Sequence, residues 1–371
     1  MSDTIYKIFT LSPGSTSTKL ALYENENCVF KASVQHDTEK LKSFAEIADQ
    51  LPYRLETISD ELKKANMTLD GTAGYAAYCG ALAPLAGGTY PVNEMMLHHA
   101  TIGYSIIHPA MLGSRIIDAL AKQYGGQAFA VDPPDVDEYD QIARVTGLKE
   151  IWRESRVHAL NQKETARRYA AKIGKRYEDC NLVVAHMGGG VSVMAHKQGR
   201  MVDGNDCANG EGPMSANRPG ALPALLLAKL CYSGKYSEKE MHALLSKRGG
   251  FLDHLDTDDG LEVVKRIQAG DKYAKLIYDA MAYQVAKQIG ADAVVLAGKV
   301  DGIILTGGMS QGAYLVSEIT KRVDWIAPVE VFAGDFEMDA LANGALRVLR
   351  GEEAPKIYTG EPVWNGFVPE E

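Results

Sequence analysis

Short apolar runs alternate along this chain with longer stretches in which apolar residues recur at spacings of three and four. The short runs predict strands at residues 5–11, 72–79, 128–132, 182–185, 300–305 and 329–333. The periodic stretches predict helices at residues 164–173, 221–231, 271–289, 312–323 and 337–350. Gly290 is expected to end the third of these helices and Asp335 to cap the last. Strands that alternate with helices throughout indicate the α/β class.

One supersecondary pattern occurs twice. The strand at 5–11 is followed by the turn SPGSTSTK (Ser12 to Lys19), and residues 20–34 then predict two strands joined by a polar turn. The strand at 182–185 is followed by the turn HMGGG, and further strands lie on either side of a turn at 197–200. Two copies of one unit, far apart in a chain, predict two related halves.

Length, charge and cysteine usage narrow the class of protein. The 371 residues exceed the size at which one hydrophobic core usually keeps growing, so two domains are expected. Five cysteines without metal-ligand spacing fit the reduced thiols of the cytosol. The net charge of −9, without a long basic block, argues against nucleic acid as a partner. The sequence has neither a bilayer-length apolar stretch nor a signal-peptide pattern, so we expect a cytoplasmic protein without a membrane partner.

Three glycine-containing turns each follow an apolar strand: SPGSTSTK, HMGGG and TGGMS. A strand that ends in glycines lets backbone N–H groups approach an anion closely. The first turn also carries the hydroxyls of Ser15 and Ser17 and the charge of Lys19, which suit a phosphate. It is not the Walker motif, which needs GxxxxGK[ST]. A single glycine turn is weak evidence, but the three together predict a nucleotide site of the kind found in actin-like ATPases.

Segments in the same order along the chain resemble the acetate kinase family, and the butyrate kinases within it. They are residues 12–19, 84–94, 130–138, 158–168, 186–203, 210–223, 305–310 and 336–353. The resemblance implies a two-domain actin-like ATPase (ribonuclease H-like) fold, in which each half is a mixed sheet flanked by helices. It assigns residues 1–150 with the C-terminal helix 338–371 to an acyl-kinase domain. Residues 151–337 would form a nucleotide-binding domain.

The same resemblance implies an activity. Butyrate and ATP would give butyryl phosphate and ADP by magnesium-dependent, in-line phosphoryl transfer, with the two halves closing on their ligands. ATP or ADP and Mg²⁺ would be the cofactors, and a small carboxylic acid or acyl phosphate would be the substrate. A homodimer or higher homo-oligomer is expected by resemblance alone.

Residue roles follow from the matched motifs. Asp132 would lie near the transferred phosphoryl group, His186 would donate to its oxygens, and Arg218 would clamp its developing charge. The resemblance implies that magnesium is held by Ser12, Asp132 and Glu337. It implies that Tyr78 and His108 line the acyl pocket. The nucleotide would meet Ser15, Ser17, Lys19, His186, Met187, Gly188, Gly189, Gly190, Gly307, Gly308 and Met309.

Simpler roles stay open for several of these side chains. The simpler role of Asp132 is to cap a turn, that of His108 is to pack in a core, and that of Glu337 is to complement a helix dipole. His186 would then be a structural histidine, and Arg218 would form a surface ion pair.

The sequence departs from the family pattern at functional positions. Ser12 stands where the family has asparagine, and Pro219 where it has serine. Tyr78 stands where the family has an arginine that meets the carboxylate. Arg54 or Arg115 could supply the missing charge. The alternative hypothesis is therefore a nucleotide-binding homologue with weak or no kinase activity, acting as a regulatory or interaction protein.

Overall fold

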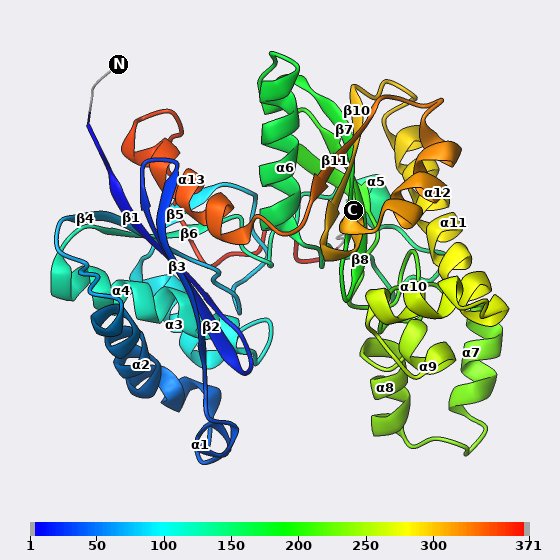
Figure 1. Cartoon of the computed structure of the whole chain (residues 1–371), viewed down its shortest axis with the longest axis horizontal. Coiled ribbons are helices and arrows are strands. Elements are labelled where there is room, and N and C mark those ends of the chain that lie inside the picture. Colours follow the sequence, from blue (N-terminus) through cyan, green and yellow to red (C-terminus); the bar gives the residue numbers. More distant parts are fainter. Residues whose placement is uncertain (1–3, 367–371) are drawn as a thin grey trace, which may run out of the picture. The chain divides into compact units, whose positions relative to one another are not determined.

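A computed structural model describes residues 4–366 and divides the chain into two compact units (Figure 1). The first unit comprises the residues up to Asp137 together with those from Phe336 onward. The second unit spans Glu138–Asp335.

The first unit contains a six-stranded mixed sheet with the order β3-β2-β1-β4-β6-β5. Its strands are β1 (Lys7–Pro13), β2 (Ser17–Glu24), β3 (Asn27–Gln35), β4 (Thr72–Ala77), β5 (Thr89–Pro91) and β6 (Gln127–Val131). Its helices are α1 (Thr38–Lys42), α2 (Leu51–Lys64), α3 (Glu94–Ile102), α4 (Leu112–Tyr124) and α13 (Glu337–Leu349), with short 3₁₀ helices η1 (Ile47–Gln50) and η2 (Pro109–Met111).

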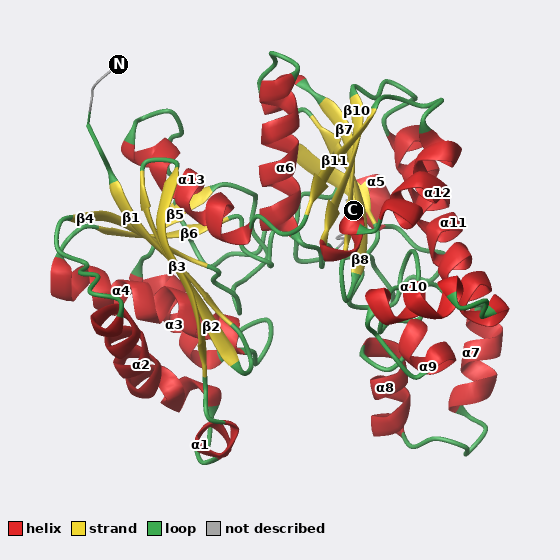
Figure 2. Cartoon of the chain, in the orientation of Figure 1, coloured by secondary structure: helices red, strands yellow, loops and turns green. Residues whose placement is uncertain are grey.

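Helices cover both faces of this sheet. Helix α13 packs on one face, and α4, with α2 beside it, packs on the other (Figures 1 and 2). Alternate residues of a strand point to opposite faces, so Phe9 and Leu11 of β1 enter one core with Ile58 of α2 and Ile116 of α4. Strands β1 and β4 pair in parallel, so their C-terminal ends lie at the same edge of the sheet.

The second unit contains a five-stranded mixed sheet with the order β11-β10-β7-β8-β9. Its strands are β7 (Asn181–Met187), β8 (Val191–Lys197), β9 (Arg200–Gly204), β10 (Gly302–Gly307) and β11 (Val329–Ala333). Its helices are α5 (Gln141–Arg144), α6 (Ala159–Lys172), α7 (Ala224–Cys231), α8 (Glu238–Ser246), α9 (Phe251–Leu255), α10 (Gly260–Gln268), α11 (Lys272–Val295) and α12 (Ala313–Val323), with 3₁₀ helices η3 (Tyr177–Asp179) and η4 (Gly308–Gln311).

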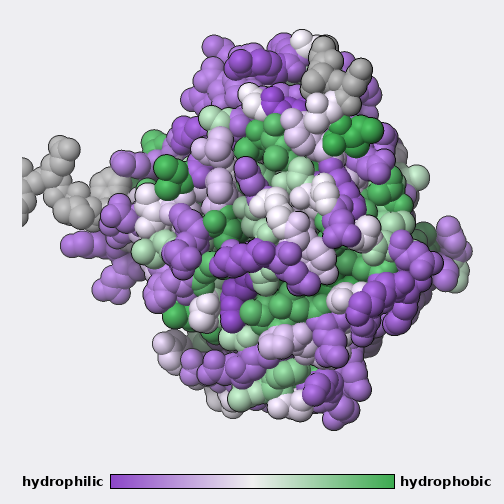
Figure 3. Space-filling model, turned by 90° about the vertical axis from the view of Figure 1, so that its left-hand side faces the viewer, coloured by the Kyte–Doolittle hydropathy of each residue, from purple (hydrophilic) through white to green (hydrophobic). Residues whose placement is uncertain are grey.

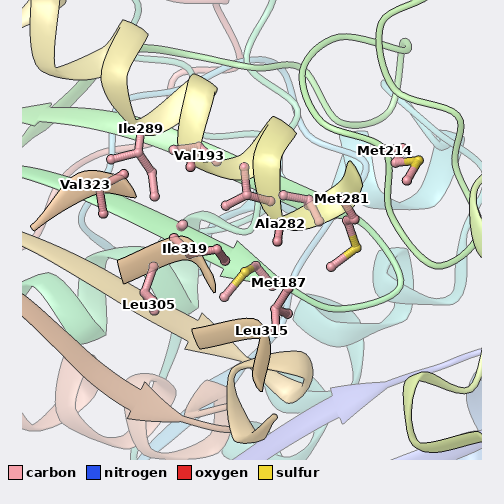
Figure 4. Close-up of a cluster of buried hydrophobic side chains, with 14 of the residues drawn as sticks. Met187, Val193, Met214, Met281, Ala282, Ile289, Leu305, Leu315, Ile319 and Val323 are labelled. Carbon is pink, nitrogen blue, oxygen red and sulfur yellow. The ribbon is translucent and has the colours of Figure 1, made fainter. Parts of the chain in front are cut away.

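The core of the second unit lies between its sheet and two helices. Figure 4 shows Met187 and Leu305 of the sheet beside Met281 of α11 and Leu315 and Ile319 of α12. Helix α6 packs on β7 and β10. Its Ala166 and Tyr169 belong to a separate buried cluster with strand residues.

The two sheets share one topology. In each, two antiparallel pairings join the first three strands, β1–β2–β3 in one unit and β7–β8–β9 in the other. In each, the first strand also pairs in parallel with a later one, β1 with β4 and β7 with β10. The prediction of an α/β protein with two related halves is confirmed.

Three details of the sequence interpretation differ from the structure. Helix α11 continues through Gly290, because the residues around it keep a packed face and a lone glycine costs a helix only about 1 kcal/mol. The N-cap of α13 is Phe336, and it makes no side-chain capping bond, so Asp335 is not the cap. The helix predicted at residues 337–350 is α13, Glu337–Leu349, whereas the segment 338–371 assigned to the first domain as a helix is helical only up to Leu349.

The crossover between the units also lies earlier than residue 150. Residues 138–150 belong to the second unit. There the N–H of Asp140 donates to Val202 O at 2.9 Å, and Glu138 forms a 2.8 Å ion pair with Lys163. The return crossover likewise falls before Phe336 rather than after residue 337.

Hydrophilic residues cover much of the face that Figure 3 shows, with apolar residues scattered in smaller areas between them. None of the helices among residues 4–366 is long and apolar enough to cross a membrane.

Candidate active site

The turn SPGSTSTK joins β1 to β2 in the first unit. It is closed by a 2.7 Å hydrogen bond from the N–H of Gly14 to Ser17 O. Ser15 is exposed, Ser17 is half-buried, and Ser12 pairs in register with Lys19. The turn therefore presents its hydroxyls at the end of a strand pair, as the sequence predicts.

Lys19 and Glu337 form an ion pair, with 3.6 Å between Nζ and Oε2. Glu337 lies in the first turn of α13, where a carboxylate is favoured by the helix dipole. The side chain of Lys19 is 48% exposed, so both groups remain within reach of a ligand. The structure thus brings together a residue predicted for the nucleotide and one predicted for the metal.

Asp132 follows β6 and is fully buried. The N–H of Gly88 donates to its Oδ1 at 2.7 Å, and its own N–H donates to Gly88 O at 3.0 Å. Its φ of 36° is uncommon for a residue other than glycine, and such strain concentrates at functional sites. The backbone of Gly88 therefore fixes the carboxylate in place.

Tyr78 lies at the same edge of the sheet as the first glycine turn. Its N–H donates to Leu11 O at 2.9 Å, directly before Ser12. Its side chain is half-buried. A Cβ on Gly113 would collide with Tyr78 O, so the start of α4 packs closely against this position.

His108 is the N-cap of η2, where its Nδ1 accepts from the N–H of Ala110 at 3.2 Å. Burial and the nearby charge of Arg54 lower the pKa of His108, so the ring is neutral at pH 7. The ring proton then lies on Nε2. The capping bond gives this side chain a structural role beside the predicted one.

His186 ends β7 in the second unit. Burial lowers its pKa to about 4, so the ring is neutral at pH 7. Asn161 donates to Nδ1 at 2.8 Å and to Thr306 Oγ1 at 3.1 Å, and the Thr306 hydroxyl donates onward to Gly334 O. Because Nδ1 accepts the hydrogen bond from Asn161, the ring proton lies on Nε2. This Nε2 lies close to Gly188, since a Cβ added there would be 3.4 Å from it. The histidine therefore presents a neutral donor to the HMGGG turn.

Arg218 lies against the same turn. Its Nη1 donates to Cys207 O at 3.1 Å and its Nε to Ser246 O at 3.3 Å. A Cβ on Gly190 would collide with Nη1, so only glycine permits this approach. Within the described part of the chain no carboxylate pairs with Arg218, and its charge is available to an anion.

The second and third glycine turns also meet. Gly307 has a φ of 88°, and a Cβ there would collide with the backbone of Met187. Gly308 begins η4, which includes Met309. The second unit thus gathers its predicted residues in one place: His186, Met187, Gly188, Gly189, Gly190, Arg218, Gly307, Gly308 and Met309.

Sequence reasoning did not assign a role to His158, which is half-buried and stacks on His186 with 4.0 Å between ring centroids. Its Nδ1 lies 2.9 Å from Ser192 Oγ. Burial, His186 and Arg218 lower its pKa well below the ordinary value. Asn161 was missed too, although both lie in the segment HALNQKETARR that carries part of the family resemblance.

Few side chains are available as ligands for the predicted magnesium ion. Residues 4–366 hold no group of three or more His, Cys, Asp or Glu side chains arranged to bind a metal. Mg²⁺ commonly takes one or two carboxylates and fills its other positions with water and phosphate oxygens. Ser12, Asp132 and Glu337 offer oxygen donors that fit this pattern.

Comparison with known proteins identifies the family. Residues 148–349 match the acetokinase family. The chain is 46% identical over 354 residues to the "Probable butyrate kinase 2" of Caldanaerobacter subterraneus subsp. tengcongensis, covering 95% of this chain and 100% of that protein. It is 44% identical to the "Probable butyrate kinase" of Clostridium botulinum strain Eklund 17B, covering 95% of this chain and 99% of that protein.

Solved structures agree on the fold. The acetate kinase of Porphyromonas gingivalis superposes with a TM-score of 0.77 at 18% identity, over 93% of this chain and 100% of that one. A propionate kinase from Francisella tularensis subsp. tularensis SCHU S4 superposes with a TM-score of 0.70 at 19% identity, over 91% of this chain and 98% of that one. The fold predicted from the glycine turns is therefore confirmed, and the chain belongs to the acetokinase family.

Proposed function

We propose that this protein phosphorylates a short-chain carboxylate with ATP, with butyrate as the leading substrate. The observation that carries the proposal is the charge of Arg218, which pairs with no carboxylate of residues 4–366 and lies against the HMGGG turn. The family and the printed names of the butyrate kinase relatives support the same activity.

The chemistry needs little from the protein beyond charge and position. A carboxylate oxygen would attack the γ-phosphorus of ATP while the bond to the ADP oxygen breaks, so no proton has to be removed. Negative charge spreads over the three phosphoryl oxygens as the bond breaks. Arg218 would balance that charge, and the neutral His186 would donate from Nε2.

Magnesium would neutralise phosphate charge when bound with the nucleotide. Ser12, Asp132 and Glu337 are the residues we assign to it. Lys19, paired with Glu337, would face the phosphates from the same strand pair. ATP and ADP themselves are assigned to the three glycine turns.

The proposed activity and its preferred substrate are tested by assaying the protein with ATP and a panel of short-chain acids. ADP release would be coupled to NADH oxidation, and acyl phosphate would be trapped with hydroxylamine. Both signals should rise together for at least one acid, and both should depend on magnesium. Magnesium-dependent ATP binding without acyl phosphate from any acid would favour the regulatory homologue instead.

We further propose that the protein self-associates. Helix α7 contributes no buried residue, and its neighbourhood exposes Leu225 (87%), Leu226 (65%) and Tyr232 (92%). Apolar surface of this kind commonly marks a protein interface. Light scattering coupled to size exclusion would show a mass above that of one chain, and a monomer at micromolar concentration would contradict the proposal.

We propose a cytoplasmic location as well. All five cysteines are free, and Cys79, Cys180 and Cys207 are buried. Free buried thiols suit a reducing compartment. Fractionation of the native cells with an antibody to this chain would test the location.

A further inference from the structure

Arg54 is a fully buried cation whose side-chain hydrogen bonds go to neutral acceptors. It lies in the first turn of α2 with an exposure of 0%. Its guanidinium donates to Gln50 Oε1 at 2.9 and 3.1 Å, to Thr18 Oγ1 at 3.0 Å and to Gly14 O at 3.0 Å. All of these acceptors are neutral. Between residues 4 and 366 no carboxylate lies within ion-pair distance of it.

Such a charge is costly to keep. Burial of an ion is unfavourable unless an opposite charge compensates it. The positive end of the α2 dipole lies on the same side, which adds to the repulsion. Burial lowers the pKa of Arg54 to about 10, so the side chain still carries its charge at neutral pH.

The neighbouring ionisable groups do not offset this charge. The Nε2 of His36 lies 3.4 Å from Nη1 and 2.7 Å from Thr18 Oγ1. Burial and Arg54 lower the pKa of His36 to about 4, and they also lower the pKa of His108. Both rings are therefore neutral at pH 7, and the local field stays positive.

The contact with Gly14 orients the phosphate turn. A trans peptide holds its C=O and N–H on opposite sides, so the Gly14 carbonyl that points at Arg54 directs the N–H of Ser15 the other way. Ser15 is exposed, and within the described residues its N–H has no protein acceptor. The buried guanidinium thus lies behind a donor that faces outward.

We propose that Arg54 is a positioning residue that prepares the first glycine turn to hold a phosphate group, by fixing the Gly14 carbonyl inward and by adding its charge behind the Ser15 N–H. This inference rests on the proposed function, whose ligands all carry phosphate. Arg54 is buried, so it acts through the turn and does not touch the substrate. Arg54 therefore does not replace the carboxylate-binding arginine whose position Tyr78 occupies.

The test compares Arg54→Gln with Arg54→Lys, and uses Arg115→Gln as the control. Arg115 lies in the same unit, is half-buried and donates to Ala48 O at 3.3 Å. Calorimetry with inorganic phosphate would be run well below each melting temperature. We expect Arg54→Gln to raise the Kd at least about tenfold, the scale of a lost charge-assisted interaction, and Arg54→Lys to stay within a few-fold of the natural protein. Equal phosphate affinity in all variants, with only the melting temperature lowered for the two at Arg54, would overturn the proposal.

Two nucleotides identify which phosphate is held. If it is the transferable group, Arg54→Gln weakens magnesium-ATP and leaves magnesium-ADP unchanged. If it is the β-phosphate, the variant binds both nucleotides more weakly to the same extent.

Should neither variant fold, phosphate titration of the ¹⁵N-labelled natural protein remains decisive. The Ser15 amide proton should shift on binding, and phosphate binding that leaves this amide unchanged would overturn the proposal.

Failure of this inference can be told from failure of the proposed function. A natural protein that makes acyl phosphate, with Arg54→Gln equal to it in phosphate affinity, would remove only the role of Arg54. A natural protein that phosphorylates no acid but binds phosphate through Arg54 would remove only the carboxylate kinase activity.

Discussion

The ring of His158 stacks on the ring of His186, with 4.0 Å between the centroids and 11° between the planes. His186 is buried and His158 is half-buried, and desolvation lowers both pKa values. Two protonated imidazoles at this distance would repel each other strongly. Burial therefore keeps His186 a neutral donor in the HMGGG turn, and the charge of a protonated His186 would in turn disfavour protonation of His158.

The first prediction concerns pH. The pKa of His186 is about 4 in the folded protein and near 6.5 when unfolded, so the unfolded chain takes up the proton first as pH falls. The free energy of unfolding should then drop between pH 6.5 and 4, by about 1–2 kcal/mol from this group at pH 5. Urea titrations at pH 7 and pH 5 measure the difference.

His158 and Arg218 also face this ring, so the control is His186→Gln, which should lose part of the pH dependence. In the natural enzyme, kcat should show no histidine inflection near pH 6.5. An inflection there that disappears in His186→Gln would mean that the ring titrates normally.

The second prediction concerns the tautomer of His186. Asn161→Asp replaces the donor to Nδ1 with an acceptor, which draws the ring proton to Nδ1 and removes the donor from Nε2. We expect kcat to fall by about 10²-fold or more. Ring ¹⁵N shifts would report the tautomer. The control is Thr165→Val, because the Thr165 hydroxyl donates to carbonyls of its own helix, Asn161 O and Gln162 O. An unchanged kcat in Asn161→Asp would show that Nε2–H is not used.

The third prediction concerns Arg218. Arg218→Ala should lower kcat by about 10²–10³-fold while the Kd for magnesium-ADP changes little, because ADP lacks the transferred group. Arg322→Ala is the control, since Arg322 pairs with Glu318. Equal losses in kcat and ADP affinity would place Arg218 on the nucleotide instead.

The fourth prediction concerns the pair Lys19–Glu337. Exposed ion pairs contribute about 0–1 kcal/mol, so Glu337→Gln should change the melting temperature little. If Glu337 helps to hold magnesium, the variant should need several-fold more magnesium for half-maximal rate. A normal magnesium requirement would exclude a role for Glu337 in holding the metal.

The fifth prediction concerns Tyr78. If this position faces the carboxylate, Tyr78→Arg should lower the KM for butyrate by about tenfold, since a charge-assisted hydrogen bond contributes about 1.5–3 kcal/mol. The natural protein and the variant would be compared over the same acid panel. A natural protein with an ordinary KM for some acid, lost in the variant, would make Tyr78 a specificity residue.

The sequence by itself determined the fold and the location of the three glycine turns. Apolar periodicity marks strands and helices because a sheet buries alternate residues and a helix buries one face. The conformation of a glycine turn after a strand depends mainly on residues that are adjacent in the sequence. For these reasons SPGSTSTK, HMGGG and TGGMS could be found without coordinates. The prediction that the helix ends at Gly290 was wrong, because packing of the residues around it continues α11 past this glycine.

Only the tertiary structure decided which side chains meet. Arg54 lies forty positions after Gly14 in the sequence, and nothing in the sequence of α2 indicates that it is buried against the first glycine turn. The His158–His186 stack and the Lys19–Glu337 pair likewise join distant segments. Burial, pKa and pairing depend on contacts made through space, and periodicity along a chain carries no record of them.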